Sequence, residues 1–300
     1  MHMFVVIDPE SGPILQMTSE HFGEPSAKLA KIDVAQTRRI IAILGEATTS
    51  ETVPLAEFYV VHLEDKKKIS PFLKKIPLVS EKSDHLKRVD KGGRILVQSV
   101  DHGISVELLH DLKEFDIEES DLQVAQVPAS KPATRRQFDW GKQYWPTSFH
   151  PNKELESLLD NTFFTEEQRQ NVYRWCERSM EVGSIVVQDD KELAYGSRTD
   201  RLLGHPVMTM VQNLARCERR YGDYLATGCD VYLRNEPCAM CAMALVHCRA
   251  ASVFYCRNTV NGVLAQGKWQ LHLEPPINHH YRVFHVETEV QEEETAVCGK

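Results

Sequence analysis

The sequence has no long run of apolar residues, and this absence argues against a helical membrane protein. No window approaches the ~18 consecutive apolar residues that a membrane-spanning helix needs. The opening Met1-His2-Met3-Phe4 also lacks the basic segment and apolar run of a secretory signal peptide, so no such signal is expected. Eight cysteines among 300 residues do not indicate a disulfide scaffold and favour a reducing compartment, and we expect the protein in the nucleus, the cytoplasm or both.

The chain also lacks an excess of positive charge. Its 43 acidic and 35 basic residues give a net charge of −8. Because affinity for phosphate comes from Lys and Arg, any RNA-binding surface must be local or shared with a partner. The apolar share of 42% is sufficient for ordinary cores, and 300 residues allow about two domains.

Two short motifs in the second half carry the chemistry: His205-Pro206-Val207 and Pro237-Cys238-Ala239-Met240-Cys241. One His and a Cys-x-x-Cys form the ligand set of zinc-dependent nucleobase deaminases, whose signature is His-x-Glu followed by Pro-Cys-x-x-Cys. Two thiols three positions apart at a helix start can face one point, where the helix dipole favours thiolates. Zinc takes thiolate and imidazole ligands in a tetrahedral arrangement. The sequence therefore predicts zinc bound by His205, Cys238 and Cys241.

Plainer interpretations of the same residues stay open. Cys238 and Cys241 can be two buried thiols in a helix or a redox pair, and His205 alone would be a core histidine. A site without catalysis needs no open metal position, so the zinc is expected to have four protein ligands. Cys298 is the candidate for the fourth, with Cys248 and Cys256 weaker, unless Cys298 is only a thiol in the tail.

One residue of the deaminase signature is missing. Val207 stands where the signature has Glu, which moves protons from the attacking water to the leaving amine and contributes ~10²–10⁴-fold to the rate. Glu236 lies next to the cysteine motif, but the signature places its acid beside the His, so Glu236 is a poor substitute. No catalytic residue is assigned, and the sequence predicts a deaminase fold that holds zinc but does not deaminate by itself.

Composition and periodicity divide the chain into two domains. A Pro-rich polar stretch without periodicity predicts a linker over residues 128–138, between an N-terminal α/β (α+β) domain of residues 1–127 and a deaminase-like domain of residues 139–300. In the first domain, Asp33 is expected to cap a helix whose apolar face carries Val34, Ile40, Ile41 and Leu44, and Ser70-Pro71 is expected to open a short helix.

The second domain reads as strands alternating with helices. A capping box at Thr165 and Gln168 opens a helix that runs to Met180. The order that follows is β-β-α-β-α-β, with both ligand motifs at helix starts, and predicts the layered α/β/α sandwich of deaminases. The segments are Ile185–Val187, Leu193–Tyr195, the helix after His205, Val231–Leu233, the helix after Cys238, and Ser252–Tyr255.

At this level of detail the chain resembles a known family. It is similar to the eukaryotic tRNA-specific adenosine deaminase and, within it, to the non-catalytic subunit 3, which has Val where the catalytic subunit has Glu. The likeness is specific over roughly residues 140–290. It rests on Gly204-His205-Pro206-Val207-Met208, Asn235 to His247, Val253-Phe254-Tyr255, Trp145 to Asn152, and Ile277-Asn278-His279-His280. The resemblance implies editing of the wobble adenosine of tRNA anticodons to inosine, carried out with a catalytic deaminase subunit as heterodimer partner.

The basic residues are concentrated in the N-terminal domain and the linker. They are interleaved with aromatics, but such runs are usually solvated faces, and it is mainly the resemblance that favours contact with RNA. We expect the first domain to grip the tRNA while the catalytic partner packs against residues 140–300. The candidate RNA-binding residues are Lys66, Lys67, Lys68, Lys74, Lys75, Lys87, Arg88, Arg135 and Arg136.

Two other function classes compete with the non-catalytic tRNA deaminase subunit. One is a self-sufficient zinc-dependent deaminase of a nucleoside or RNA, with a proton shuttle placed elsewhere. The other is a zinc-stabilised RNA-binding scaffold unrelated to deamination. Val207 argues against the first, and the detailed match around the cysteine helix argues against the second.

Overall fold

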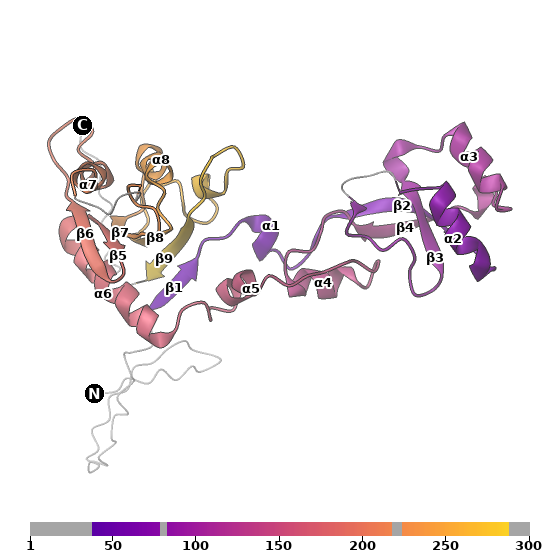
Figure 1. Cartoon of the computed structure of the whole chain (residues 1–300), viewed down its shortest axis with the longest axis horizontal. Coiled ribbons are helices and arrows are strands. Elements are labelled where there is room, and N and C mark those ends of the chain that lie inside the picture. The colour runs from indigo at the N-terminus through magenta and orange to yellow at the C-terminus, as the bar shows by residue number, and fades with distance from the viewer. Residues whose placement is uncertain (1–37, 79–82, 218–223, 288–300) are drawn as a thin grey trace, which may run out of the picture. The chain divides into compact units, whose positions relative to one another are not determined.

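The computed structural model describes residues 38–78, 83–217 and 224–287 (Figure 1). All described residues belong to one compact unit. They build one six-stranded and one three-stranded sheet. Within this part of the chain, no helix is both long and apolar enough to span a membrane.

The six-stranded sheet carries the two ligand motifs. Its strand order is β1-β9-β8-β7-β5-β6, in which β7, β8 and β9 are parallel neighbours and the other pairs are antiparallel. The strands are β1 (Arg39–Ala42), β5 (Ser184–Gln188), β6 (Lys191–Gly196), β7 (Asp230–Asn235), β8 (Ser252–Arg257) and β9 (Arg282–Glu287).

Helices cover both faces of this sheet. On one face, α6 (Glu166–Val182) buries Val172, Tyr173 and Cys176 against the strands. On the other, α7 (Pro206–Leu214) and α8 (Ala239–Cys248) share the larger core. This confirms the predicted α/β/α sandwich and its β-β-α-β-α-β order.

Local signals start and stop these elements as expected. The capping box is present at the start of α6. Thr165 Oγ1 accepts a hydrogen bond from the Gln168 backbone N–H, and Gln168 Oε1 accepts one from the Thr165 backbone N–H. Positive φ angles at Asp189 and Asp190 make the tight turn between β5 and β6.

The predicted helix after Asp33 was wrong. Arg39–Ala42 forms strand β1, which pairs antiparallel with β9 at the edge of the six-stranded sheet. Ile40 is buried against Phe284 and Val286 in the core beneath α6, whereas Ile41 is 39% exposed. Alternation of this kind is a strand pattern, and β1 pairs with residues more than 200 positions away. Asp33 itself lies outside the described residues.

The three-stranded sheet is antiparallel, in the order β3-β2-β4. Its strands are β2 (Leu55–His62), β3 (Arg94–Ser99) and β4 (Gln123–Pro128). Helices α2 (Lys66–Lys75) and α3 (Val106–Lys113) pack on one face through Phe72, Leu108 and Leu112. The remaining short elements are α1 (Glu46–Thr49), α4 (Arg135–Gly141), α5 (Lys153–Leu159) and the 3-10 turns Val100–His102, Glu119–Asp121 and Leu271–Leu273.

Helix α2 begins earlier than predicted. The Asp65 side chain accepts a hydrogen bond from the Lys67 backbone N–H at 2.9 Å, and this cap starts the helix at Lys66, so that Pro71 lies inside it. A proline inside a helix removes one backbone hydrogen bond. Burial of Phe72 and Ile76 on the three-stranded sheet keeps the helix in place.

The segment after β4 packs back on the three-stranded sheet. Trp145 is fully buried with Phe58 and Leu96 on the face opposite α2, and its Nε1 donates to the Lys87 backbone oxygen at 2.7 Å. The division into residues 1–127, 128–138 and 139–300 stays a prediction. Trp145, from the predicted second domain, packs in the core of the three-stranded sheet, whereas β1, from the predicted first domain, is part of the six-stranded sheet.

Candidate metal centre

The start of helix α7 brings the histidine into place. His205 is its N-cap residue and Pro206 its first residue, where a missing N–H costs nothing. Gly204 must be glycine, because a Cβ there would lie 2.3 Å from the Thr199 backbone oxygen. The loop before the helix closes on itself through hydrogen bonds from Thr199 N to Gly204 O and from Gly204 N to Arg201 O.

A second glycine seats α7 on the sheet. A Cβ on Gly196, the last residue of β6, would lie 2.2 Å from the Pro206 backbone oxygen and 2.3 Å from the Met210 backbone nitrogen. The helix therefore rests directly on β6 at this point. Sequence reasoning missed Gly196, because nothing local marks which helix will cross a given glycine.

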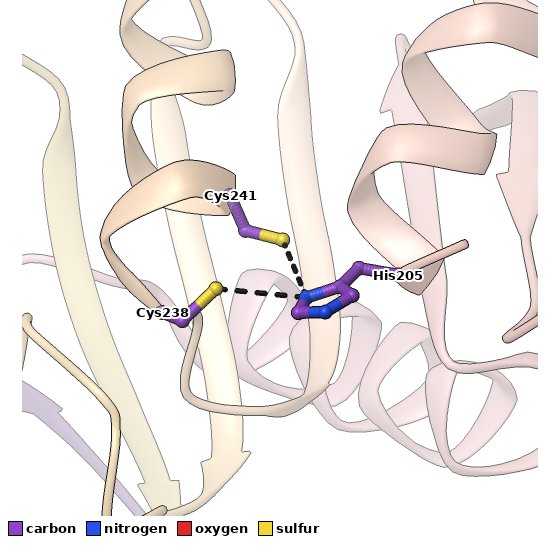
Figure 2. Close-up of side chains that lie close together, drawn as sticks. All are labelled: His205, Cys238 and Cys241. Carbon is purple, nitrogen blue, oxygen red and sulfur yellow. Dashed lines mark hydrogen bonds between the residues drawn. The ribbon is translucent and has the colours of Figure 1, made fainter. Parts of the chain in front are cut away.

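The start of helix α8 supplies both thiols. Cys238 is its N-cap residue and Cys241 the third residue of its first turn. Two helix N-termini thus meet at one point, each with a partial positive charge that favours thiolates. The predicted spacing rule is confirmed, since both sulfurs face the same imidazole nitrogen (Figure 2).

The distances at this point fit a tetrahedral zinc ion. His205 Nδ1 lies 3.5 Å from Cys238 Sγ and 3.5 Å from Cys241 Sγ (Figure 2). Zinc bound at ~2.3 Å to sulfur and ~2.0–2.1 Å to nitrogen, with tetrahedral angles, sets the two ligand atoms roughly 3.5 Å apart. His205, Cys238 and Cys241 therefore form a cluster whose size and donor atoms suit a zinc ion.

The Cys241 thiol must lose its proton before it can bind a metal. Burial, together with the neighbouring Cys238 thiol, raises the pKa of Cys241 to about 12. At neutral pH the Cys241 thiol therefore keeps its proton unless a bound cation displaces it. A cluster built from two thiols and an imidazole is suited to zinc rather than to calcium or magnesium, which take oxygen ligands.

The position of the missing acid is buried and apolar. Val207 lies in the first turn of α7, is 4% exposed, and packs in the same core as Cys241, Met210 and Leu245. Nothing at this position can accept or donate a proton.

Glu236 cannot take over the role of the missing acid. Its carboxylate is fully buried, and it accepts hydrogen bonds from the backbone N–H groups of Leu264, Ala265 and Thr259 and from Lys268 Nζ. Burial alone would raise the pKa of Glu236, but the Lys268 ammonium and the three N–H groups lower it overall. The prediction that Glu236 is a poor proton shuttle agrees with this arrangement.

The other cysteines lie away from the cluster or outside the described residues. Cys248 is the last residue of α8, ten positions after Cys238 and so roughly 15 Å along the helix. Cys256 lies in the core beneath α6, within hydrogen-bonding reach of Cys176. Neither can be the fourth ligand. Cys298 lies outside the described residues, so its role stays a prediction.

A second group of potential ligands is already occupied. His110, Asp111 and Glu114 lie close together on and just after α3. Lys75 Nζ lies 3.2 Å from a carboxylate oxygen of both Asp111 and Glu114, so an ammonium fills the place that a metal would take.

The proposed RNA-binding lysines of α2 fall into two classes. Lys68 pairs with Asp116 at 2.7 Å, and Lys75 pairs with the acids of α3. Within the described part of the chain, Lys66, Lys67 and Lys74 are exposed and make no ion pair. Sequence reasoning missed this difference, because the paired acids are 36–48 positions away.

The remaining candidates also differ. Arg88 is partly buried and donates to the backbone oxygens of Ile76 and Leu96, at 2.8 and 2.9 Å, so it holds the three-stranded part together. Lys87 is exposed. Arg135 and Arg136 are both exposed at the start of α4. Arg135 lies over the Phe149 ring, and Arg136 lies 4.0 Å from the carboxylates of Glu51 and Asp160.

Comparison with known proteins identifies the region around the cluster. Residues 160–257 match the family described as the cytidine and deoxycytidylate deaminase zinc-binding region. A solved structure from a study of A-to-I editing by tRNA:A34 deaminases at the wobble position of transfer RNA aligns with a TM-score of 0.32 and 18% identity, covering 39% of this chain and 98% of that one.

Named relatives occur in animals, plants and yeasts. The human "probable inactive tRNA-specific adenosine deaminase-like protein 3" is 33% identical over 210 residues, 53% of this chain and 60% of that protein. The tRNA-specific adenosine deaminase TAD3 of Arabidopsis thaliana is 52% identical over 64 residues, 21% of this chain and 16% of that one. The tRNA-specific adenosine deaminase subunit TAD3 of Saccharomyces cerevisiae is 28% identical over 152 residues, 43% and 47% of the two. The chain spans about three fifths of the human relative's length.

Proposed function

Because the chain is a homologue of proteins named tRNA-specific adenosine deaminase-like protein 3 and TAD3, and carries a deaminase zinc-binding region, we propose that it is the non-catalytic subunit of a heterodimeric tRNA adenosine deaminase. The complex converts the wobble adenosine of anticodons to inosine. The observation that carries this proposal is a cluster of one histidine and two cysteines beside a buried valine at the position of the catalytic acid.

Zinc is the metal that this cluster is built to hold. His205 Nδ1 and the two thiolates supply three ligands, and the two helix N-termini stabilise the negative charge. In a deaminase, zinc acidifies a bound water for attack on the base. Here no acid stands beside His205 to move the protons, so the metal serves the structure of the domain.

A partner must therefore supply the chemistry. Helices α7 and α8 share one core and contact each other, and both carry half-exposed apolar side chains on top of it. Thioether side chains adapt to another protein's surface more readily than branched ones. This favours the pair of helices as the surface on which the catalytic subunit packs. The residues are Met208, Val211, Met240, Met243 and Ala244.

The N-terminal part supplies the contact with tRNA in this proposal. A target base must be turned out of the anticodon stack into the partner's pocket, and a folded RNA is held largely through its backbone and shape. Lys66, Lys67 and Lys74 on one helix, with Arg135 on α4, offer unpaired or lightly paired cations in an otherwise acidic chain.

A purification and an editing assay test the function. The chain is isolated from its native source and bound proteins are identified by mass spectrometry, with a second deaminase-like chain as the expected result. The chain alone and the reconstituted complex are then incubated with a tRNA carrying adenosine at the wobble position, and inosine is measured. We expect inosine from the complex and none from the chain alone.

The alternatives give different outcomes. Inosine formed by the isolated chain, with contaminating deaminase excluded, would identify a self-sufficient deaminase with its proton shuttle elsewhere. A chain that binds tRNA but never co-purifies with a deaminase would be the RNA-binding scaffold. Val207→Glu need not restore activity, because the surrounding pocket is packed as a core.

A further inference from the structure

A loop after β8 is fastened to the metal motif by a single buried carboxylate. Glu236 stands two residues before Cys238 and its side chain is completely inaccessible. Oε1 accepts from Leu264 N and Ala265 N, both at 2.8 Å. Oε2 accepts from Thr259 N at 3.2 Å and from Lys268 Nζ at 2.8 Å. Hydrogen bonds to a buried carboxylate are among the stronger ones in proteins, so this group fixes the path of residues 259–268.

The same loop touches the metal ligand directly. Gly262 forms a β-bridge with Cys238, and Val263 N donates to the Pro237 backbone oxygen at 3.2 Å. Gly262 leaves the space that the carboxylate fills, because a Cβ there would lie 2.0 Å from Glu236 Cδ. The loop is therefore held against the turn that carries Cys238 by side-chain hydrogen bonds to Glu236 and by backbone hydrogen bonds.

We propose that Glu236 is a positioning residue that couples the metal centre to residues 259–270, so that metal binding at Cys238 and order in this loop stabilise each other. Pro237 joins Glu236 to Cys238 with a fixed φ, which leaves little slack between the carboxylate and the ligand. Coupling between two sites is reciprocal. The inference rests on the proposed zinc occupancy and not on the proposed role in tRNA editing.

In a domain without the catalytic acid, the metal would then have a structural role, which is to order this loop. The loop carries two large apolar side chains into solvent, Val260 at 96% and Trp269 at 57% exposure. A loop held at its base by a buried carboxylate and a metal-bound turn presents such side chains in one conformation. Loss of the metal then makes the loop less ordered, while the six-stranded sheet stays folded.

Hydrogen exchange and metal release test the coupling on the full chain, or on its complex if the chain is insoluble alone. Amide exchange is followed by mass spectrometry in metal-loaded and chelator-treated protein, and zinc release into a chelating dye gives the dissociation rate. Two variants break the contact differently. Glu236→Gln removes the charge and one acceptor, and Gly262→Ala pushes the carboxylate aside.

Two control variants make similar changes away from the cluster. In the three-stranded part, Asp90 accepts from Arg94 N at 2.8 Å and from Arg94 Nε at 2.7 Å, so Asp90→Asn perturbs a comparable carboxylate. Gly92→Ala adds a Cβ that meets no atom closer than 3.4 Å.

In the wild-type protein, removal of zinc is expected to speed exchange in peptides covering residues 259–270 and to leave the three-stranded part unchanged. Glu236→Gln and Gly262→Ala are each expected to speed zinc release by ~10–100-fold, as for other groups that support a metal ligand, and the two controls to leave it unchanged. Zinc that binds without changing exchange in this loop would overturn the coupling, and so would unaltered release in both variants. A wild-type chain that binds no zinc would instead refute the proposed metal.

Discussion

Neutralising the unpaired lysines of α2 should cost more tRNA affinity than neutralising the paired ones. The test variant is Lys66→Gln, Lys67→Gln, Lys74→Gln, which keeps most of each side chain and removes three charges that make no ion pair among the described residues. The comparison variant is Lys68→Gln, Lys75→Gln, whose charges are offset by acids at 2.7 and 3.2 Å.

The magnitude follows from counterion release. Each lost phosphate contact lowers the slope of log affinity against log salt by ~0.7–0.9, so three contacts lower it by roughly 2–3. At 0.15 M salt the same loss weakens binding on the order of 100-fold. The paired lysines already have carboxylate partners, and their removal should change the slope by less than about 1.

The assay is tRNA binding by the reconstituted complex across a salt series, with zinc content and assembly of the heterodimer as controls that should not change. If both variants bind with the wild-type slope, this lysine stretch is only a solvated face, and the RNA contact must be sought in the linker or on the partner. If the paired variant loses as much slope as the unpaired one, the ion pairs do not decide which lysines meet phosphate.

Three further predictions concern stability, the metal and the partner. Burial lowers the pKa of His272 to about 4, below the ~6.5 of an unfolded histidine, so the unfolded state binds the proton more tightly. The free energy of unfolding should therefore decrease as the pH falls below ~6.5, by about 2 kcal/mol at pH 5. Urea unfolding at pH 7.5 and pH 5 should show a smaller pH dependence for His272→Gln than for the wild type. Gly204→Ala should displace His205 and lower zinc content measured by metal analysis, and full occupancy would show that the loop can relax. Met243→Glu should prevent co-purification of the catalytic subunit, whereas Val106→Glu, at a site 79% exposed in the three-stranded part, should not; equal effects would place the partner elsewhere.

Local features could be predicted from residue types and short spacings. The residue types and spacing of His205 and the Cys-x-x-Cys were enough to predict that they share one metal ion. Val207 at the position of the Glu was enough to predict that the catalytic acid is missing. The capping box at Thr165 and Gln168 and the alternation of strands and helices were enough for the order of the second domain. These features depend on contacts within one or two turns of chain, which residue pattern encodes directly.

Features that depend on partners far away in the sequence could not be predicted and emerged with the three-dimensional fold. The run around Ile40 became a strand because β9 offered an open edge, and a short apolar run has no periodicity strong enough to choose. Likewise, Arg88 became internal because two backbone oxygens needed a donor, and Glu236 became a loop anchor because Gly262 left room for it. In each case the stabilising free energy comes from pairing buried polar groups, or burying apolar surface, between segments far apart in the sequence. The residues next to each position in the sequence carry no sign of such a partner.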